Sequence, residues 1–187
     1  FDSLIAALNA NKVDMVISGV NPTEERKKAV DFSDVYYTSK GIFVVNKDSE
    51  EIKSVADLKN KKIGVQKGST YETYAKEQLK MDDKNIQALT DVPSLLQDLK
   101  NKKIDAVLIP DDVAKIAMNK YTDIKISTFT ADNDPEATGM AIAFKKGKND
   151  SNKELLEQVN AVIKEIQDQK AFEKELDKYA KVAAQSE

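Results

Sequence analysis

Short runs of apolar and β-branched residues alternate along this chain with longer segments in which apolar residues recur every three or four positions. The short runs predict strands, and near-continuous apolar runs are typical of strands buried on both faces. The longer segments predict amphipathic helices. We expect strands at Val13–Ser18, Gly41–Asn46, Lys62–Gln66, Ile86–Leu89, Ile104–Ile109, Ile126–Phe129 and Met140–Phe144. We expect helices at Ser3–Asn11, Thr23–Ala29, Thr70–Lys80, Pro93–Asn101, Asp112–Lys120 and Asn152–Gln167, with one more at the C-terminal end. This alternation predicts an α/β fold with a mostly parallel sheet.

A weak internal repeat relates two parts of the chain. The segment Leu8–Ile17 reads LNANKVDMVI, and the segment Leu99–Leu108 reads LKNKKIDAVL. Leucine, lysine, aspartate and valine recur at matched places. One interpretation is that any helix–turn–strand unit converges on such a pattern; the other is that the chain contains two similar lobes.

The second interpretation predicts a two-lobed molecule. Lobe one would comprise residues 1–39 and 140–187, and lobe two residues 40–139, with hinge strands near 41–46 and 140–144. Ligands often bind in the cleft that such a hinge spans. Because a strand, a helix and a strand precede the repeat in lobe two, we expect lobe one to lack its N-terminal strand–helix–strand, about 30–40 residues. The alternative is one continuous sheet without a hinge.

Composition excludes several classes of function. The net charge is only −3 and basic residues are interspersed with acidic ones, so we expect no nucleic-acid partner. The chain has no histidine and no cysteine, which removes thiolate nucleophiles and zinc–thiolate sites. We expect no catalytic residues, no metal site and no cofactor. No apolar run is long enough to span a bilayer and no signal peptide is visible, so we expect any export signal to have been removed.

Two segments carry candidate binding chemistry, since each follows a strand and opens a helix. In the first, Gly19 allows close backbone approach, Asn21 is a plausible helix cap, and Arg26 can point back toward the strand end. A guanidinium binds a carboxylate through two parallel hydrogen bonds. The alternative is a surface arginine paired with Glu24 or Glu25.

The second segment is GVQKGSTY, residues 64–71, in which Ser69 and Thr70 begin a helix whose free N–H groups favour an anion. The alternative is an ordinary helix cap; the segment is too short for a phosphate-binding loop. Asp111 and Asp112, after another strand, offer carboxylates to an ammonium. A carboxylate site and an ammonium site together describe a free α-amino acid.

The order of these motifs strongly resembles the polar-amino-acid solute-binding proteins of bacterial ABC importers. The resemblance rests on KVDMVISGVNPTEERKKAVDFSDVYY (12–37), VQKGST (65–70), KIDAV (103–107) and GMAIAFKKG (139–147), and it covers the whole chain. It implies the two-lobed fold of type 2 periplasmic binding proteins.

The resemblance also implies the roles of individual residues. Arg26 would bind the ligand α-carboxylate with Ser69 and Thr70, and Asn21 would accept from the ammonium. Gly19 and Val20 would offer backbone contacts. Phe1 would pack on the aliphatic part of the ligand, and Gln66 and Tyr71 would line the side-chain subsite.

The chain departs from the family at one of these positions. The family commonly has an aspartate on the ammonium where this chain has Pro110, so we assign that role to the next residue, Asp111, although a shift of one residue along a strand reverses the side chain's direction.

The resemblance implies an extracytoplasmic binding subunit, without enzymatic activity, that delivers a free polar L-amino acid to a permease and its ATPase subunits. Glutamine, arginine, lysine, histidine and cystine all remain open as ligands. We expect a lipoprotein on the surface of a Gram-positive bacterium, held only by a lipid anchor absent from this chain, or otherwise a periplasmic protein. The alternatives are a sensor domain and a dehydratase-like enzyme built on the same fold.

Overall fold

The computed structural model describes residues 1–131, 138–147 and 152–185 of the 187-residue chain. The chain divides into two compact units. The first comprises Phe1–Ser39 and Pro135–Asp177, and the second Lys40–Asp134 and Lys178–Glu187. Each unit is built on its own sheet, so the alternative of one continuous sheet is wrong for the described residues.

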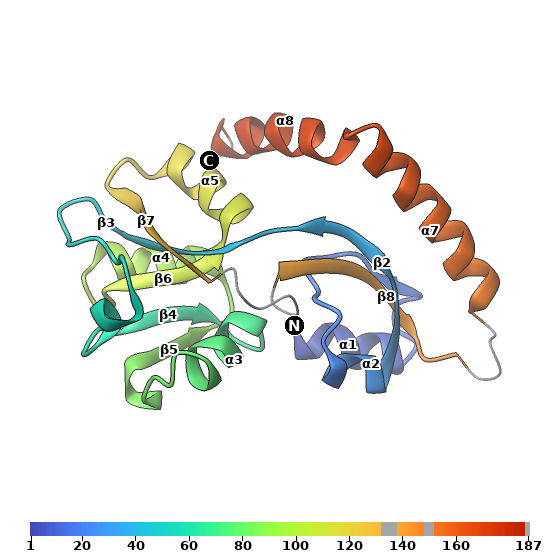
Figure 1. Cartoon of the computed structure of the whole chain (residues 1–187), viewed down its shortest axis with the longest axis horizontal. Coiled ribbons are helices and arrows are strands. Elements are labelled where there is room, and N and C mark those ends of the chain that lie inside the picture. The colour runs from blue at the N-terminus through green and yellow to red at the C-terminus, as the bar shows by residue number, and fades with distance from the viewer. Residues whose placement is uncertain (132–137, 148–151, 186–187) are drawn as a thin grey trace. The chain divides into compact units, whose positions relative to one another are not determined.

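Helices and strands alternate along much of the chain (Figure 1). The helices are α1 (Asp2–Asn9), α2 (Glu24–Ala29), α3 (Thr70–Glu77), α4 (Val92–Lys100), α5 (Asp111–Lys120), α7 (Lys153–Asp168) and α8 (Ala171–Gln185), with 3-10 turns at Val55–Leu58 and Asp83–Asn85. The strands are β1 (Met15–Val16), β2 (Val30–Thr38), β3 (Gly41–Asn46), β4 (Ile63–Gln66), β5 (Ile86–Leu89), β6 (Ala106–Pro110), β7 (Ile124–Ala131) and β8 (Gly139–Lys145).

The sheet of the first unit has the order β1-β8-β2, and β8 runs antiparallel to both neighbours. Val16 and its partner Ala143 pack with Leu8 of α1 and with Val20 and Val30. Helix α7 lies on the opposite side of this sheet from α1 (Figure 1). It is held to β2 by two side chains: Asn160 Oδ1 accepts from the Asp34 N–H at 2.9 Å, and Gln167 donates to the Val35 carbonyl at 2.8 Å.

The sheet of the second unit has the order β5-β4-β6-β3-β7 and is covered on both faces. Along β3, Phe43 and Val45 join a core that includes Tyr71 and Tyr74 of α3. The alternate residues Ile42 and Val44 join a second core, formed mainly with α4 and α5. Because both faces are covered, every residue of β3 is buried, which explains its apolar run Ile42–Val45.

The expectation of a mostly parallel sheet is wrong. In the described residues the parallel pairs are β4 with β5 and β4 with β6. Strand β3 is antiparallel to β6 and β7, and β8 is antiparallel to β1 and β2. Continuous apolar runs report burial on both faces, and they do not report strand direction.

One strand, β2, escaped the sequence analysis. Its nine residues read VDFSDVYYT, and its pairing with β8 shifts register between Phe32 and Val35 and again between Val35 and Tyr37. Such irregularities place two residues opposite one and break the period-two alternation on which a strand prediction depends.

The two copies of the internal repeat form the same helix–turn–strand unit. In each copy a fully buried leucine, Leu8 or Leu99, is the last residue but one of a helix, and a residue with φ of 55° follows three positions later, Asn11 or Lys102. The backbone N–H of that residue donates to the leucine carbonyl, at 3.1 Å in the first copy and 3.0 Å in the second. The sequence similarity therefore reflects one local structure used twice.

Candidate functional site

The first candidate segment is a loop that ends in the short helix α2. Thr23 caps this helix, because its side-chain oxygen accepts from the Arg26 backbone N–H at 3.2 Å. The expectation that Asn21 is the cap is therefore wrong. The Asn21 side chain is buried and donates from its amide nitrogen to the Gly139 carbonyl of β8 at 2.6 Å.

The loop before the cap is held closely against the first unit's sheet. The Val20 N–H donates to the Ser18 carbonyl at 2.6 Å, and the Val20 carbonyl accepts from the Ala141 N–H at 3.0 Å. The Tyr36 hydroxyl donates to the same Ser18 carbonyl at 2.8 Å. These bonds connect the loop to β2 and β8, so its backbone is positioned by two strands.

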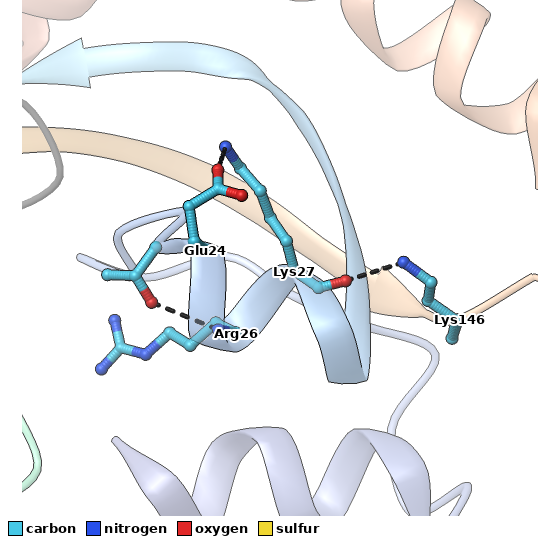
Figure 2. Close-up of polar contacts among 5 residues, drawn as sticks. Glu24, Arg26, Lys27 and Lys146 are labelled. Atoms are coloured by element: carbon cyan, nitrogen blue, oxygen red, sulfur yellow. Dashed lines mark hydrogen bonds and ion pairs between the residues drawn. The ribbon is translucent and has the colours of Figure 1, made fainter.

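Arg26 folds back over this loop. Its side chain is partly buried, and its Nη1 donates to the Asn21 carbonyl at 3.2 Å. Its Cζ lies 5.7 Å from the centroid of the Phe1 ring, within the range of a cation–π contact. Figure 2 shows the guanidinium pointing away from the ion pair between Glu24 and Lys27, whose atoms are 2.7 Å apart. The Arg26 side chain is therefore directed toward the Asn21 carbonyl in the loop that follows β1.

Gly19 lies in this loop without being crowded by the protein. A Cβ at this position would approach the Met140 side chain no closer than 3.6 Å, an ordinary contact. The fold itself therefore leaves room for a larger residue at Gly19.

The second candidate segment joins β4 to α3 in the second unit. Gly68 adopts a φ of 71°, a conformation that favours glycine. The buried Ser69 caps α3, with its side-chain oxygen accepting from the Glu72 N–H at 3.3 Å, and Thr70 is the first helical residue. The predicted helix start is confirmed at residue level.

Gln66 and Tyr71 lie on either side of this cap. The Gln66 amide donates to the Thr90 carbonyl at 3.0 Å, and the Tyr71 side chain is buried in the core. A Cβ added to Gly41 would lie 2.5 Å from Tyr71 Cε1, so the ring packs directly on the β3 backbone.

The carboxylates that follow β6 differ in their surroundings. Asp111 accepts from the Lys40 N–H at 3.1 Å and lies 3.6 Å from the Lys115 ammonium. Asp112 has a buried Oδ1 without a hydrogen-bond partner, and burial raises the pKa of its carboxyl above the ordinary range. Asp111 is thus engaged by backbone, whereas Asp112 is the carboxylate with an unsatisfied oxygen.

The predicted residues gather at one place within each unit. Phe1, Val20, Asn21 and Arg26 are connected by the contacts above in the first unit. In the second unit, β4 and β6 are parallel neighbours, so Gln66 and Pro110 end their strands at the same edge of the sheet. Binding residues commonly lie at the carboxyl ends of parallel strands.

Sequence reasoning missed Glu72, whose carboxylate accepts from the Gly68 N–H at 2.8 Å. The signal was present, because Ser69-Thr70-Tyr71-Glu72 has the spacing of a capping box. Arg26 is also the only arginine among the 29 basic residues of the sequence, which distinguishes it from the lysines.

The described residues contain no cluster of acidic side chains that could hold a metal ion. Across the same part of the chain, none of the helices combines the length and apolar character needed to cross a membrane.

Known proteins are similar to this chain in sequence and in fold. The family model for bacterial extracellular solute-binding proteins, family 3, matches residues 1–182. An arginine-binding extracellular protein of Bacillus subtilis is 41% identical over 93% of this chain, and an L-cystine-binding protein of Escherichia coli is 35% identical over 89%. The chain spans 66% and 60% of these two relatives' lengths.

The solved structures agree with the sequence comparison. An amino acid ABC transporter substrate-binding protein from Streptococcus pneumoniae, bound to L-arginine, matches with a TM-score of 0.86 at 31% identity, over 97% of this chain and 73% of that one. The substrate-binding protein of another amino acid ABC transporter matches with a TM-score of 0.79 at 42% identity, over 95% and 75%. The expected fold, that of type 2 periplasmic binding proteins, is confirmed. The chain belongs to family 3 of the bacterial extracellular solute-binding proteins.

Proposed function

We propose that this chain is the ligand-binding part of an ABC importer, and that it binds a free polar L-amino acid for delivery to a membrane permease. Its family and the names of the relatives given above support this role, since those relatives are named as binding proteins for arginine and L-cystine. The proposal includes no catalytic step.

The observation that carries the proposal is the placement of Arg26. A chain that uses lysine for every other basic residue has its one arginine in a partly buried position, against the Asn21 carbonyl and the Phe1 ring. Lysine could supply the charge, but only a guanidinium offers a planar fork that matches a carboxylate. Arg26 is therefore the proposed partner of the ligand's α-carboxylate.

The second unit supplies the complementary groups in this proposal. The α3 N-terminus, capped by Ser69 and continued by Thr70, favours an anion and would share the carboxylate. Asp111 or Asp112, which follow β6, would receive the ammonium. Gln66 and Tyr71 would line the side-chain subsite, while Phe1 would contact the ligand's aliphatic part.

Ligand binding would couple the two units, because each offers only part of the zwitterion's partners. A ligand shifts a conformational equilibrium only through contacts that differ between the two states. Micromolar affinity requires about −8 kcal/mol, to which a desolvated arginine–carboxylate pair would contribute a few kcal/mol.

The proposed location is outside the cytoplasm, as the family description indicates. Attachment through a lipid anchor to a Gram-positive cell surface is a further part of the proposal, and so are the permease and ATPase subunits as partners.

Calorimetric titration of the full-length protein with a panel of amino acids, beginning with L-arginine, tests this function. We expect one or a few ligands at micromolar affinity. Arg26→Ala should lower the affinity by more than about 100-fold, consistent with loss of a buried charged pair. Arg26→Lys should recover only part of it, and Lys28→Ala, at an exposed site on the same helix, should bind normally.

Several results would contradict the proposal. Near-normal affinity of Arg26→Ala would remove Arg26 from the site. Consumption of a bound amino acid, followed by mass spectrometry, would instead favour a dehydratase-like enzyme. Absence of binding by the full-length protein to the whole panel would refute amino-acid binding itself.

A further inference from the structure

We propose that Glu72 is a positioning residue for the proposed carboxylate-binding loop Gly68-Ser69-Thr70, which it holds in its binding conformation from one helical turn away. This inference rests on the function proposed above, because it assigns the loop to the ligand carboxylate. Glu72 itself would not touch the ligand.

The geometry is reciprocal. The Glu72 Oε2 accepts from the Gly68 N–H at 2.8 Å, and the Glu72 N–H donates to the Ser69 side-chain oxygen at 3.3 Å. One residue therefore fixes both sides of the cap, the glycine before it and the hydroxyl that forms it. The Glu72 Oε1 is held in turn by the Lys76 ammonium at 2.8 Å.

The loop needs this external restraint because of Gly68. Its φ of 71° lies in the left-handed region, where glycine is favoured but is not confined. A glycine samples many backbone conformations, so hydrogen bonds must hold this one, and the Ser69 N–H closes the turn by donating to the Gln66 carbonyl at 3.1 Å. The Gly68 hydrogen bond to Glu72 adds a side-chain restraint to this turn, and the cap then presents Ser69 and Thr70 at the start of α3.

The charge of Glu72 is compensated within the same element. Burial acts to raise the pKa of its carboxyl, but the hydrogen bonds from Lys76 and the Gly68 N–H, with the charges of Lys76 and Lys67, outweigh it and hold the pKa below the ordinary range. Glu72 is therefore an anion at neutral pH. Its side chain is only 19% exposed, and the paired Lys76 limits its repulsion of a second carboxylate at the same helix end.

Three variants of the full-length protein test this inference, with L-arginine as the titrated ligand. Glu72→Gln keeps an acceptor for the Gly68 N–H, whereas Glu72→Ala removes it. Glu77→Ala, at an exposed site on α3, removes the same charge without touching the loop. The readouts are affinity by calorimetry and the amide exchange rate of Gly68 by NMR.

We expect Glu72→Ala to bind about 10-fold more weakly and its Gly68 amide to exchange about 10-fold faster, as the loss of one charged hydrogen bond implies. Glu72→Gln should bind within about threefold of the natural protein, and Glu77→Ala should match it in both readouts. A merely structural role would lower the melting temperature of Glu72→Ala without changing affinity, and that result would overturn the inference.

The two proposals fail in different ways. If the natural protein binds no amino acid, the proposed function fails, and the Gly68 exchange rate alone decides whether Glu72 holds the loop. An exchange rate that is unchanged in both Glu72 variants overturns the inference even where ligand binding is normal. Should Glu72→Ala not fold, Glu72→Asp, which is one methylene too short to reach Gly68, replaces it with the same expectations.

Discussion

The side-chain amide of Asn21 donates a 2.6 Å hydrogen bond to the carbonyl oxygen of Gly139, a residue 118 positions further along the chain. Both residues are buried. The carbonyl of the same Asn21 accepts from Arg26 Nη1 at 3.2 Å. Strand β8 therefore positions Asn21, whose carbonyl accepts the hydrogen bond from the Arg26 guanidinium. A strand from late in the chain thus supports the candidate binding residue of the first unit.

Replacing Asn21 with alanine should destabilise the protein by about 1–3 kcal/mol, because the buried Gly139 carbonyl would lose its partner. The free energy of unfolding, measured by urea denaturation with circular dichroism, checks this. Asn119→Ala is the control, since Asn119 is an exposed residue in α5 and alanine favours a helix. Equal stability of the two variants would show that the Asn21 bond contributes nothing measurable.

Gly41→Ala should destabilise the second unit and displace Tyr71. The added Cβ would lie 2.5 Å from Tyr71 Cε1 and 3.0 Å from the Ala131 Cβ, which is closer than real contacts allow. Overpacking of this kind costs about 1–3 kcal/mol. Thermal unfolding measures the loss. Gly19→Ala is the matched control, because its new Cβ would meet nothing closer than 3.6 Å and should leave stability unchanged.

A double-mutant cycle makes the Gly41 prediction specific. Combined with Tyr71→Leu, which removes the ring edge, Gly41→Ala should cost less than it does alone. Strict additivity of the two changes would mean that the strain arises elsewhere.

Much of the fold could be predicted because buried segments such as β3 contain runs of apolar residues that are visible in the sequence. The bounds of β3 and β5 were predicted to the residue, and β3 contains the buried apolar run Ile42–Val45. The direction of the strands could not be predicted, because a residue buried on both faces looks the same in a parallel and an antiparallel pair. Strand β2 was missed where its irregular pairing hides the alternation.

The candidate site shows the same division between local and long-range information. The cap at Ser69 follows from residues within one helical turn and was predictable, whereas Arg26 donates to the carbonyl of Asn21, five positions earlier in the chain. The role of Asn21 was not predictable, because its partner Gly139 lies far away in sequence and an asparagine before a helix resembles a cap. Only the pairing of β1 and β2 with β8 brings the two together.

Lys102→Gly should stabilise the protein by up to about 1 kcal/mol. Lys102 has a φ of 55° after α4, a conformation that costs most residues about 1–2 kcal/mol but costs glycine little. Its exposed ion pair with Asp48, at 2.8 Å, is worth little in comparison. Urea denaturation checks the gain in stability.

Asn11→Gly, at the equivalent place in the other copy of the repeat, should gain less, since asparagine tolerates this conformation better. A loss of stability in Lys102→Gly would show that the lysine side chain outweighs the backbone strain.

Asp112→Asn should stabilise the protein at neutral pH and have less effect in acid. Burial raises the pKa of this carboxyl, the nearby charge of Asp111 adds to the rise, and the Val113 N–H and Lys115 oppose it. With its folded pKa above its unfolded one, the group contributes stability that is fully present below about pH 4 and is lost as the pH rises through the folded pKa.

Asparagine cannot ionise, so the Asp112→Asn variant should gain on the order of 1 kcal/mol at pH 7, and that gain should disappear by about pH 3. Urea denaturation across this pH range measures the difference, with Asp82→Asn as the control for removing an exposed carboxylate. A stability difference that stays constant from acid to neutral pH would mean that burial does not destabilise the ionised Asp112 carboxylate in solution.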